Sequence, residues 1–200
     1  MRSTRNTPRP LVTAATLLLA VEAAQAHTGH ATGTVWAGLV HPFGLDHLLA
    51  MVAVGLWAMV ALPRAQRWSG PLAFMAALLV GAGAGAAGWG ADLLEHAVAL
   101  SVAGMGLLLF MSRQALPSAI GLSVTAAIGL LHGLAHGAES PAGGMAGYAV
   151  GFLLTTAALH LGGMALGLSV QRLAGEGRRW ALASLSAVLG GAGVFLFTQL

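Results

Sequence analysis

Two short stretches of the sequence carry imidazole and carboxylate side chains at spacings that suit a metal ion. The first reads His-Pro-Phe-Gly-Leu-Asp-His and runs from His41 to His47. On an unbroken helix these two histidines would face different sides, because six residues end about 240° around the axis from the start. Pro42 and Gly44 can interrupt or begin a helix, which would let His41 fold back. We therefore predict that His41, Asp46 and His47 bind one ion.

The second stretch reads His-Gly-Leu-Ala-His-Gly-Ala-Glu, from His132 to Glu139. His132 and His136 are four residues apart and share one face of a helix, and Glu139 continues that face if the helix extends so far. Imidazole is a common ligand of nickel, cobalt, copper, zinc and iron, and carboxylates supplement it. These residues predict the second half of a divalent-cation site.

Three further residues have two interpretations each. His160 lies near the middle of a predicted helix, where it is either another ligand or a hydrogen-bond partner of a neighbouring helix. Glu95 opens a predicted helix and lies either at an entrance to the site or among lipid headgroups. Met51 is one turn beyond His47 and is either a soft ligand or a packing residue.

The composition indicates that all these groups lie in a membrane protein. Of the 200 residues, 57% are apolar and 8% charged, against about 25% charged residues in soluble domains. The chain has 29 glycines, which suits closely packed membrane helices. It has no cysteine, which excludes thiolate ligands and disulfides. Most of the small positive charge lies near the N-terminus, so no basic patch supports nucleic-acid binding.

Apolar runs long enough to span a bilayer, which takes about 20 residues, recur along the chain. The sequence therefore predicts an all-α, polytopic transmembrane helical bundle of six helices in a single domain, 27–200. The predicted helices cover about 35–62, 70–90, 93–112, 117–136, 143–170 and 180–199.

Residues 1–26 read as a secretory signal peptide. Three arginines precede a short apolar core, and Ala24-Gln25-Ala26 provides small residues for cleavage before His27. The alternative is an uncleaved first membrane helix. If the peptide is cleaved, His27 and His30 lie in the mature N-terminal tail. This tail is either a weak metal-binding segment at the membrane surface or an unstructured segment.

Charge alternation between the predicted loops indicates the orientation. Arg64, Arg113 and Arg178 mark every second loop, whereas Asp92 and Glu139 mark the others. Since arginine-rich loops stay in the cytoplasm, we predict that the mature N-terminus and the C-terminus face the periplasm of a bacterial inner membrane.

The motifs resemble those of the HupE/UreJ family of nickel permeases. The stretches from His41 to Met51 and from His132 to Glu139 are similar to the family's two histidine motifs. The stretch from Glu95 through Ser101 to Val102 resembles its Glu-x-x-x-Ala-x-Ser-Val pattern, and the stretch from Gly151 to His160 resembles its Gly-Phe-x-x-x-Thr-x-x-Leu-His pattern. The resemblance implies secondary uptake of Ni²⁺ or Co²⁺ for metalloenzymes such as hydrogenase or urease.

The leading prediction is therefore a permease, not an enzyme, whose partners are a divalent transition-metal ion as substrate and the lipid bilayer. No prosthetic group is expected, and a homo-oligomer stays open. Histidine pairs on bundle helices also ligate haem, so a membrane haem or redox-metal protein is the alternative. A metal-dependent membrane enzyme, with Glu139 as general base, is a third class.

Overall fold

The computed structural model describes residues 34–90, 92–112, 114, 116–139 and 145–200. The predicted signal peptide, His27 and His30 lie outside these residues. Within them the chain is helical, without strands. The helices, with two short 3-10 turns (η1 and η2), are α2 (Val35–Val40), η1 (His41–Phe43), α3 (Leu45–Ala61), η2 (Arg64–Gln66), α4 (Ser69–Ala86), α5 (Leu94–Met111), α6 (Ser118–Ala138), α7 (Met145–Arg172) and α8 (Gly175–Phe197).

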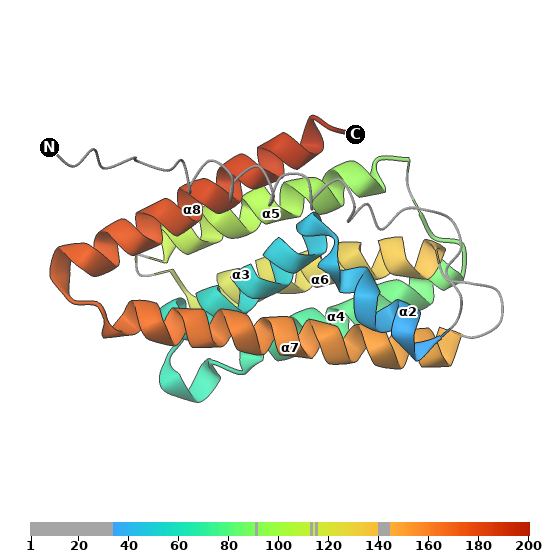
Figure 1. The fold of residues 1–200 in the computed structure, drawn as a ribbon, viewed down its shortest axis with the longest axis horizontal. Coiled ribbons are helices and arrows are strands. Elements are labelled where there is room, and N and C mark those ends of the chain that lie inside the picture. Colours follow the sequence, from blue (N-terminus) through green and yellow to red (C-terminus); the bar gives the residue numbers. More distant parts are fainter. Residues whose placement is uncertain (1–33, 91, 113, 115, 140–144) are drawn as a thin grey trace, which may run out of the picture.

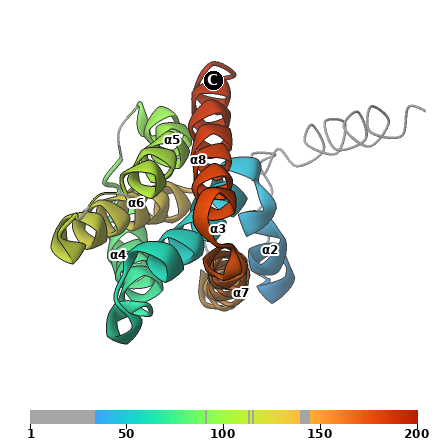
Figure 2. The same ribbon diagram turned by 90° about the vertical axis from the view of Figure 1, so that its left-hand side faces the viewer.

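The predicted polytopic helical bundle is confirmed. Five helices are long and apolar enough to cross a membrane, and α2 with η1 and α3 makes a sixth span if the bent pair is counted as one. The long helices run side by side along the molecule (Figure 1). Viewed along its length, α3 lies in the middle with the other helices around it (Figure 2). Accordingly, α3 supplies much of the buried core, including Ala50, Met51, Val54, Leu56 and Trp57.

The predicted first span, 35–62, is broken into two helices at Pro42 and Gly44, the residues expected to interrupt it. It bends by 80° between Val35–Phe43 and Leu45–Ala61. Pro42 occupies the start of the 3-10 turn η1, and Gly44 has extended ψ of 137°, so neither continues an α-helix. The 17 residues of α3 cover about 25 Å at 1.5 Å per residue, which is less than the roughly 30 Å hydrocarbon core. The span therefore needs both halves.

Glycines allow the helices around the break to touch backbone to backbone. A Cβ added at Gly81 of α4 would overlap the carbonyl oxygen of Leu130 in α6, and one at Gly55 of α3 would overlap that of His160 in α7. Inside lipid the hydrophobic effect does not hold helices together, so their association depends on van der Waals packing at such close contacts. It fixes α6 against α4 and α7 against α3, so that histidines from different helices face one interior.

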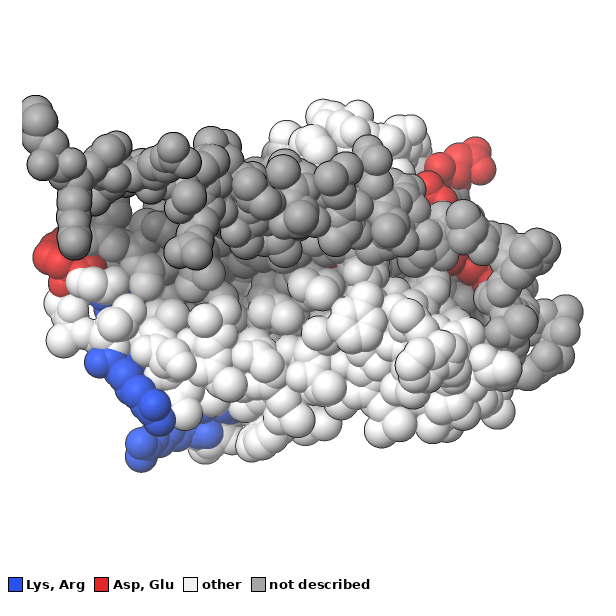
Figure 3. Space-filling view, in the orientation of Figure 1, with Lys and Arg blue, Asp and Glu red and all other residues white. Residues whose placement is uncertain are grey.

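The two ends of the bundle differ in charge. Arginines occupy the α3–α4 and α7–α8 connections, and in Figure 3 they gather at the left-hand end together with a small acidic patch, while the coloured side chains at the right-hand end are all acidic. Exposed tryptophans mark both ends: Trp68 and Trp180 lie near the arginine end, and Trp36 and Trp89 near the acidic end. Paired aromatic belts are typical of membrane–water interfaces.

Candidate metal site

Three histidines from separate elements meet beside the break between α2 and α3. His41 lies in η1, His47 in the first turn of α3 and His136 in the last turn of α6. One nitrogen from each ring lies within 4.8 Å of the other two. Two imidazoles on one ion, each about 2.1 Å from it, have their nitrogens at most about 4.2 Å apart. Three nitrogens spread evenly around one ion lie closer still, about 3.6 Å from one another, so a contraction of slightly more than about 1 Å would let all three bind it.

Asp46 fixes the orientation and the tautomer of His47. The carboxylate oxygen Oδ1 accepts hydrogen bonds from the His47 ring Nδ1 at 2.7 Å and from the His47 backbone N–H at 2.8 Å. Nδ1 therefore carries the proton, and Nε2 keeps its lone pair. That Nε2 atom is buried and has no hydrogen-bond partner among the described residues. A carboxylate behind a ligating imidazole is a recurrent arrangement in metal sites.

A fourth histidine, His132, lies directly beneath the cluster. Its ring centroid is 4.7 Å from that of His47, and its side chain is fully buried. The Ser101 hydroxyl donates to the Val98 carbonyl at 2.6 Å, so its oxygen accepts from the His132 Nε2–H at 3.0 Å. His132 consequently keeps a lone pair on Nδ1, a buried atom without a partner in the described part of the chain.

Aromatic rings close one side of the cluster. Phe152 packs against His136 at 4.2 Å between centroids, and Tyr148 packs edge-on against His41 at 5.6 Å. Beyond them a cavity of about 260 Å³ lies between α4, α6 and α7, lined mainly by apolar side chains such as Leu78, Ala82 and Leu153, with His136 at its margin. The imidazoles thus sit against apolar surface, where electrostatic interactions are stronger than in water.

The other predicted site residues are not members of this triad, although Glu139 is near enough to Tyr148, which packs on His41, to interact with it electrostatically. Glu95 is exposed in the first turn of α5, and Glu139 is exposed just after the last turn of α6. His160 is buried farther along α7 and packs edge-on against Phe74 at 5.1 Å. Met51 belongs to the apolar core.

Sequence reasoning did not assign a role to Ser101, Tyr148 or Phe152. Ser101 and Phe152 occur within stretches that resemble family patterns, so a signal was present, but neither is a strong metal ligand. Their contribution is to orient or enclose imidazoles. That role depends on contacts between helices, which residue type alone does not reveal.

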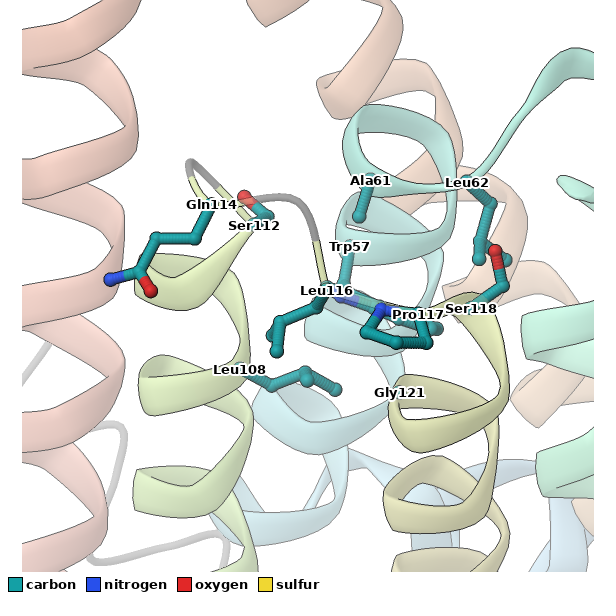
Figure 4. A pocket seen from close by; sticks show the side chains of 10 residues that line it. All are labelled: Trp57, Ala61, Leu62, Leu108, Ser112, Gln114, Leu116, Pro117, Ser118 and Gly121. Atoms are coloured by element: carbon teal, nitrogen blue, oxygen red, sulfur yellow. The ribbon is translucent and has the colours of Figure 1, made fainter.

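A second, much smaller hollow of about 20 Å³ lies at the arginine end, between α3, α5 and α6 (Figure 4). It is room for about one water molecule. Its lining residues include Trp57, Leu108, Leu116 and Pro117, and it contains no histidine or carboxylate. This hollow therefore adds nothing to the metal-ligand set.

The fold and the site together define a polytopic helical membrane protein with a histidine cluster inside the bundle. The sequence matches the HupE / UreJ protein family over residues 15–196, and the chain belongs to this family. It is also 44% identical over 146 residues to "Protein HupE" of Rhizobium leguminosarum bv. viciae, covering 72% of this chain and 75% of that protein. No solved structure matches the chain.

Proposed function

We propose that the protein is a secondary permease that carries Ni²⁺ or Co²⁺ from the periplasm across the bacterial inner membrane. The observation that carries the proposal is the meeting of His41, His47 and His136, one ligand nitrogen each within 4.8 Å, inside a membrane bundle of the HupE/UreJ family. Imidazole suits both ions. The cargo would serve the maturation of a metalloenzyme such as hydrogenase or urease.

The position of the cluster supports a transport role. Ionisable groups within a bilayer are rare and mark ion pathways. His41 and His47 flank a helix break, and broken helices at membrane depth commonly form the substrate sites of secondary transporters. A set of imidazole ligands without thiolates would also hold a divalent ion weakly enough to release it, which conduction requires.

Ring packing favours a bare ion over haem. The centroids of His41 and His136 are 4.6 Å apart, and those of His47 and His136 are 4.5 Å apart. Rings in such direct contact leave no slot for a porphyrin between them. A Soret band in the purified protein would restore the haem alternative.

The proposed orientation places the arginine end in the cytoplasm and the acidic end in the periplasm, following the positive-inside rule. Glu95 and Glu139, both exposed at the acidic end, would attract cations toward the cluster. A cleaved leader, 1–26, would then put the mature N-terminus on the same side as the C-terminus.

Uptake of radioactive nickel and cobalt by cells that express the chain tests the function, with zinc, copper, iron and manganese as competitors. His47→Ala should abolish uptake at normal membrane expression. His96→Ala is the matched control, since His96 packs against Phe197, away from the cluster. Equal loss in both variants, or wild-type uptake in His47→Ala, would reject the proposed site.

A further inference from the structure

His160 is a buried imidazole that does not belong to the group of His41, His47 and His136, called the outer cluster from here on. Its side chain is 2% exposed, and neither ring nitrogen has a hydrogen-bond partner among the described residues. Buried polar atoms are nearly always satisfied, so a histidine with two free nitrogens calls for an explanation. An ion or water that visits the residue supplies one.

Thr156 adds an oxygen atom to the same face. It lies four residues before His160 on α7, so the two side chains are one above the other. Its side chain is fully buried, and its Oγ1 also has no partner in the part of the chain that the structure describes. An imidazole nitrogen and a hydroxyl oxygen therefore point from one stripe of α7 into the interior.

This pair lies near mid-membrane, deeper than the outer cluster. His160 is twelve residues after Tyr148, which touches His41, and twelve residues before Arg172 at the end of α7. Each interval corresponds to about 18 Å at 1.5 Å per residue. An ion that leaves the cluster for the arginine end must cross the level of His160.

The ring of Phe74 contacts one histidine at each of the two levels. Its ring centroid is 5.7 Å from that of His132 and 5.1 Å from that of His160, and its side chain is fully buried. Its backbone is held against α6, because a Cβ added at Gly129 would overlap the Phe74 carbonyl oxygen. Motion at this point is therefore confined to the aromatic side chain.

We propose that His160 and Thr156 form a second, inner station for the transported divalent ion, separated from the outer histidine cluster by the ring of Phe74. The inference rests on the proposed function. The ion is held at the outer cluster, passes when the Phe74 side chain rotates aside, and is received by the imidazole of His160. Two weak stations in series permit release at the far side, as multi-site conduction requires.

The absence of cysteine from the sequence provides a direct test. Co²⁺ bound to a thiolate gives an intense near-ultraviolet charge-transfer band, and wild-type protein has no thiol to produce one. Purified His160→Cys and Thr156→Cys should each develop the band with Co²⁺, and so should His47→Cys at the outer cluster. His96→Cys and Ser186→Cys, at buried or partly buried positions elsewhere in the bundle, should not.

The outcomes separate the two proposals. A band in His47→Cys without one in His160→Cys or Thr156→Cys would overturn the inner station and leave the proposed function standing. No band in His47→Cys either would count against the outer site itself. If His160→Cys fails to fold, Thr156→Cys still tests the proposal, because a cysteine side chain is close in size to the threonine that it replaces.

Phe74 is tested by the rate at which the band appears. Combining Phe74→Ala with His160→Cys should accelerate its appearance, and a gain of about tenfold would correspond to a barrier lowered by roughly 1.4 kcal/mol. Leu78→Ala, one turn along the same buried face of α4, controls for general loosening. Equal rates in the Phe74 double variant and its parent would overturn the separating role of the ring.

Discussion

At the scale of single residues, the His47 ring and backbone both donate to Oδ1 of Asp46, so in the proposed site the carboxylate would act on the ion through His47. Asp46→Asn keeps the shape and removes the charge. We expect the nickel affinity of the purified protein to fall by about 10–100-fold, the usual effect of losing such a partner. Glu176→Gln, which alters an exposed acid at the other end of the molecule, should leave affinity unchanged. Wild-type affinity in Asp46→Asn would assign the carboxylate a structural role only.

Ser101 holds His132 in one tautomer through the hydroxyl oxygen. Ser101→Ala removes that acceptor and leaves the Nε2–H buried without a partner, which costs about 1–3 kcal/mol. Nickel affinity should fall, but less than in His132→Ala, as measured by titration calorimetry. Ser186→Ala is the matched control, since Ser186 is also buried and donates to a carbonyl within its own helix. A drop of equal size in both variants would contradict the tautomer argument.

At the scale of elements, the contact between α4 and α6 depends on where its glycines face. Gly81 touches the α6 backbone, whereas a Cβ added at Gly83 would meet nothing within 4 Å. Gly81→Ala should force α4 and α6 apart, displace His132 and His136 and lower thermal stability. Gly83→Ala should instead be neutral or stabilise the helix by about 0.5–1 kcal/mol. Fluorescence melting curves in detergent measure both, and equal melting temperatures would contradict the packing.

The break between α2 and α3, which positions His41 and His47, was predictable in its location but not in its angle. Pro42 and Gly44 predicted a break, because proline lacks an N–H and glycine lacks a Cβ, and the break is present. Its 80° bend could not be predicted, because both halves pack closely against α7 and such contacts join segments distant in sequence. Likewise, α8 begins at Gly175, whereas the predicted helix began near 180. The prediction missed the first turn because it followed apolar residues, and this turn is polar and carries an Arg179–Glu176 ion pair.

At the scale of the whole molecule, apolar length alone was enough to predict the number and order of the long helices, because a bilayer imposes one length on every span. It could not show which helices pair. His132 and His136 were correctly expected to share a face, yet the structure brings only His136 into the outer triad and places His132 one turn deeper. The difference in depth follows from their four-residue spacing on α6, whereas which of the two turns meets His41 and His47 depends on packing between helices distant in sequence.

The two ends of the molecule give the last prediction, the orientation in the membrane. Trp68 and Trp180 are exposed near the arginine end, and Trp36 and Trp89 near the other, so the axis of the bundle crosses both interfaces. The chain has no cysteine, hence single cysteines report one position each. Gln66→Cys at the arginine end should resist an impermeant maleimide added to intact cells and react after permeabilisation, because positive loops stay in the cytoplasm. Asp92→Cys at the acidic end should react in both. The reverse pattern would invert the proposed direction of transport, since the outer cluster would then open toward the cytoplasm.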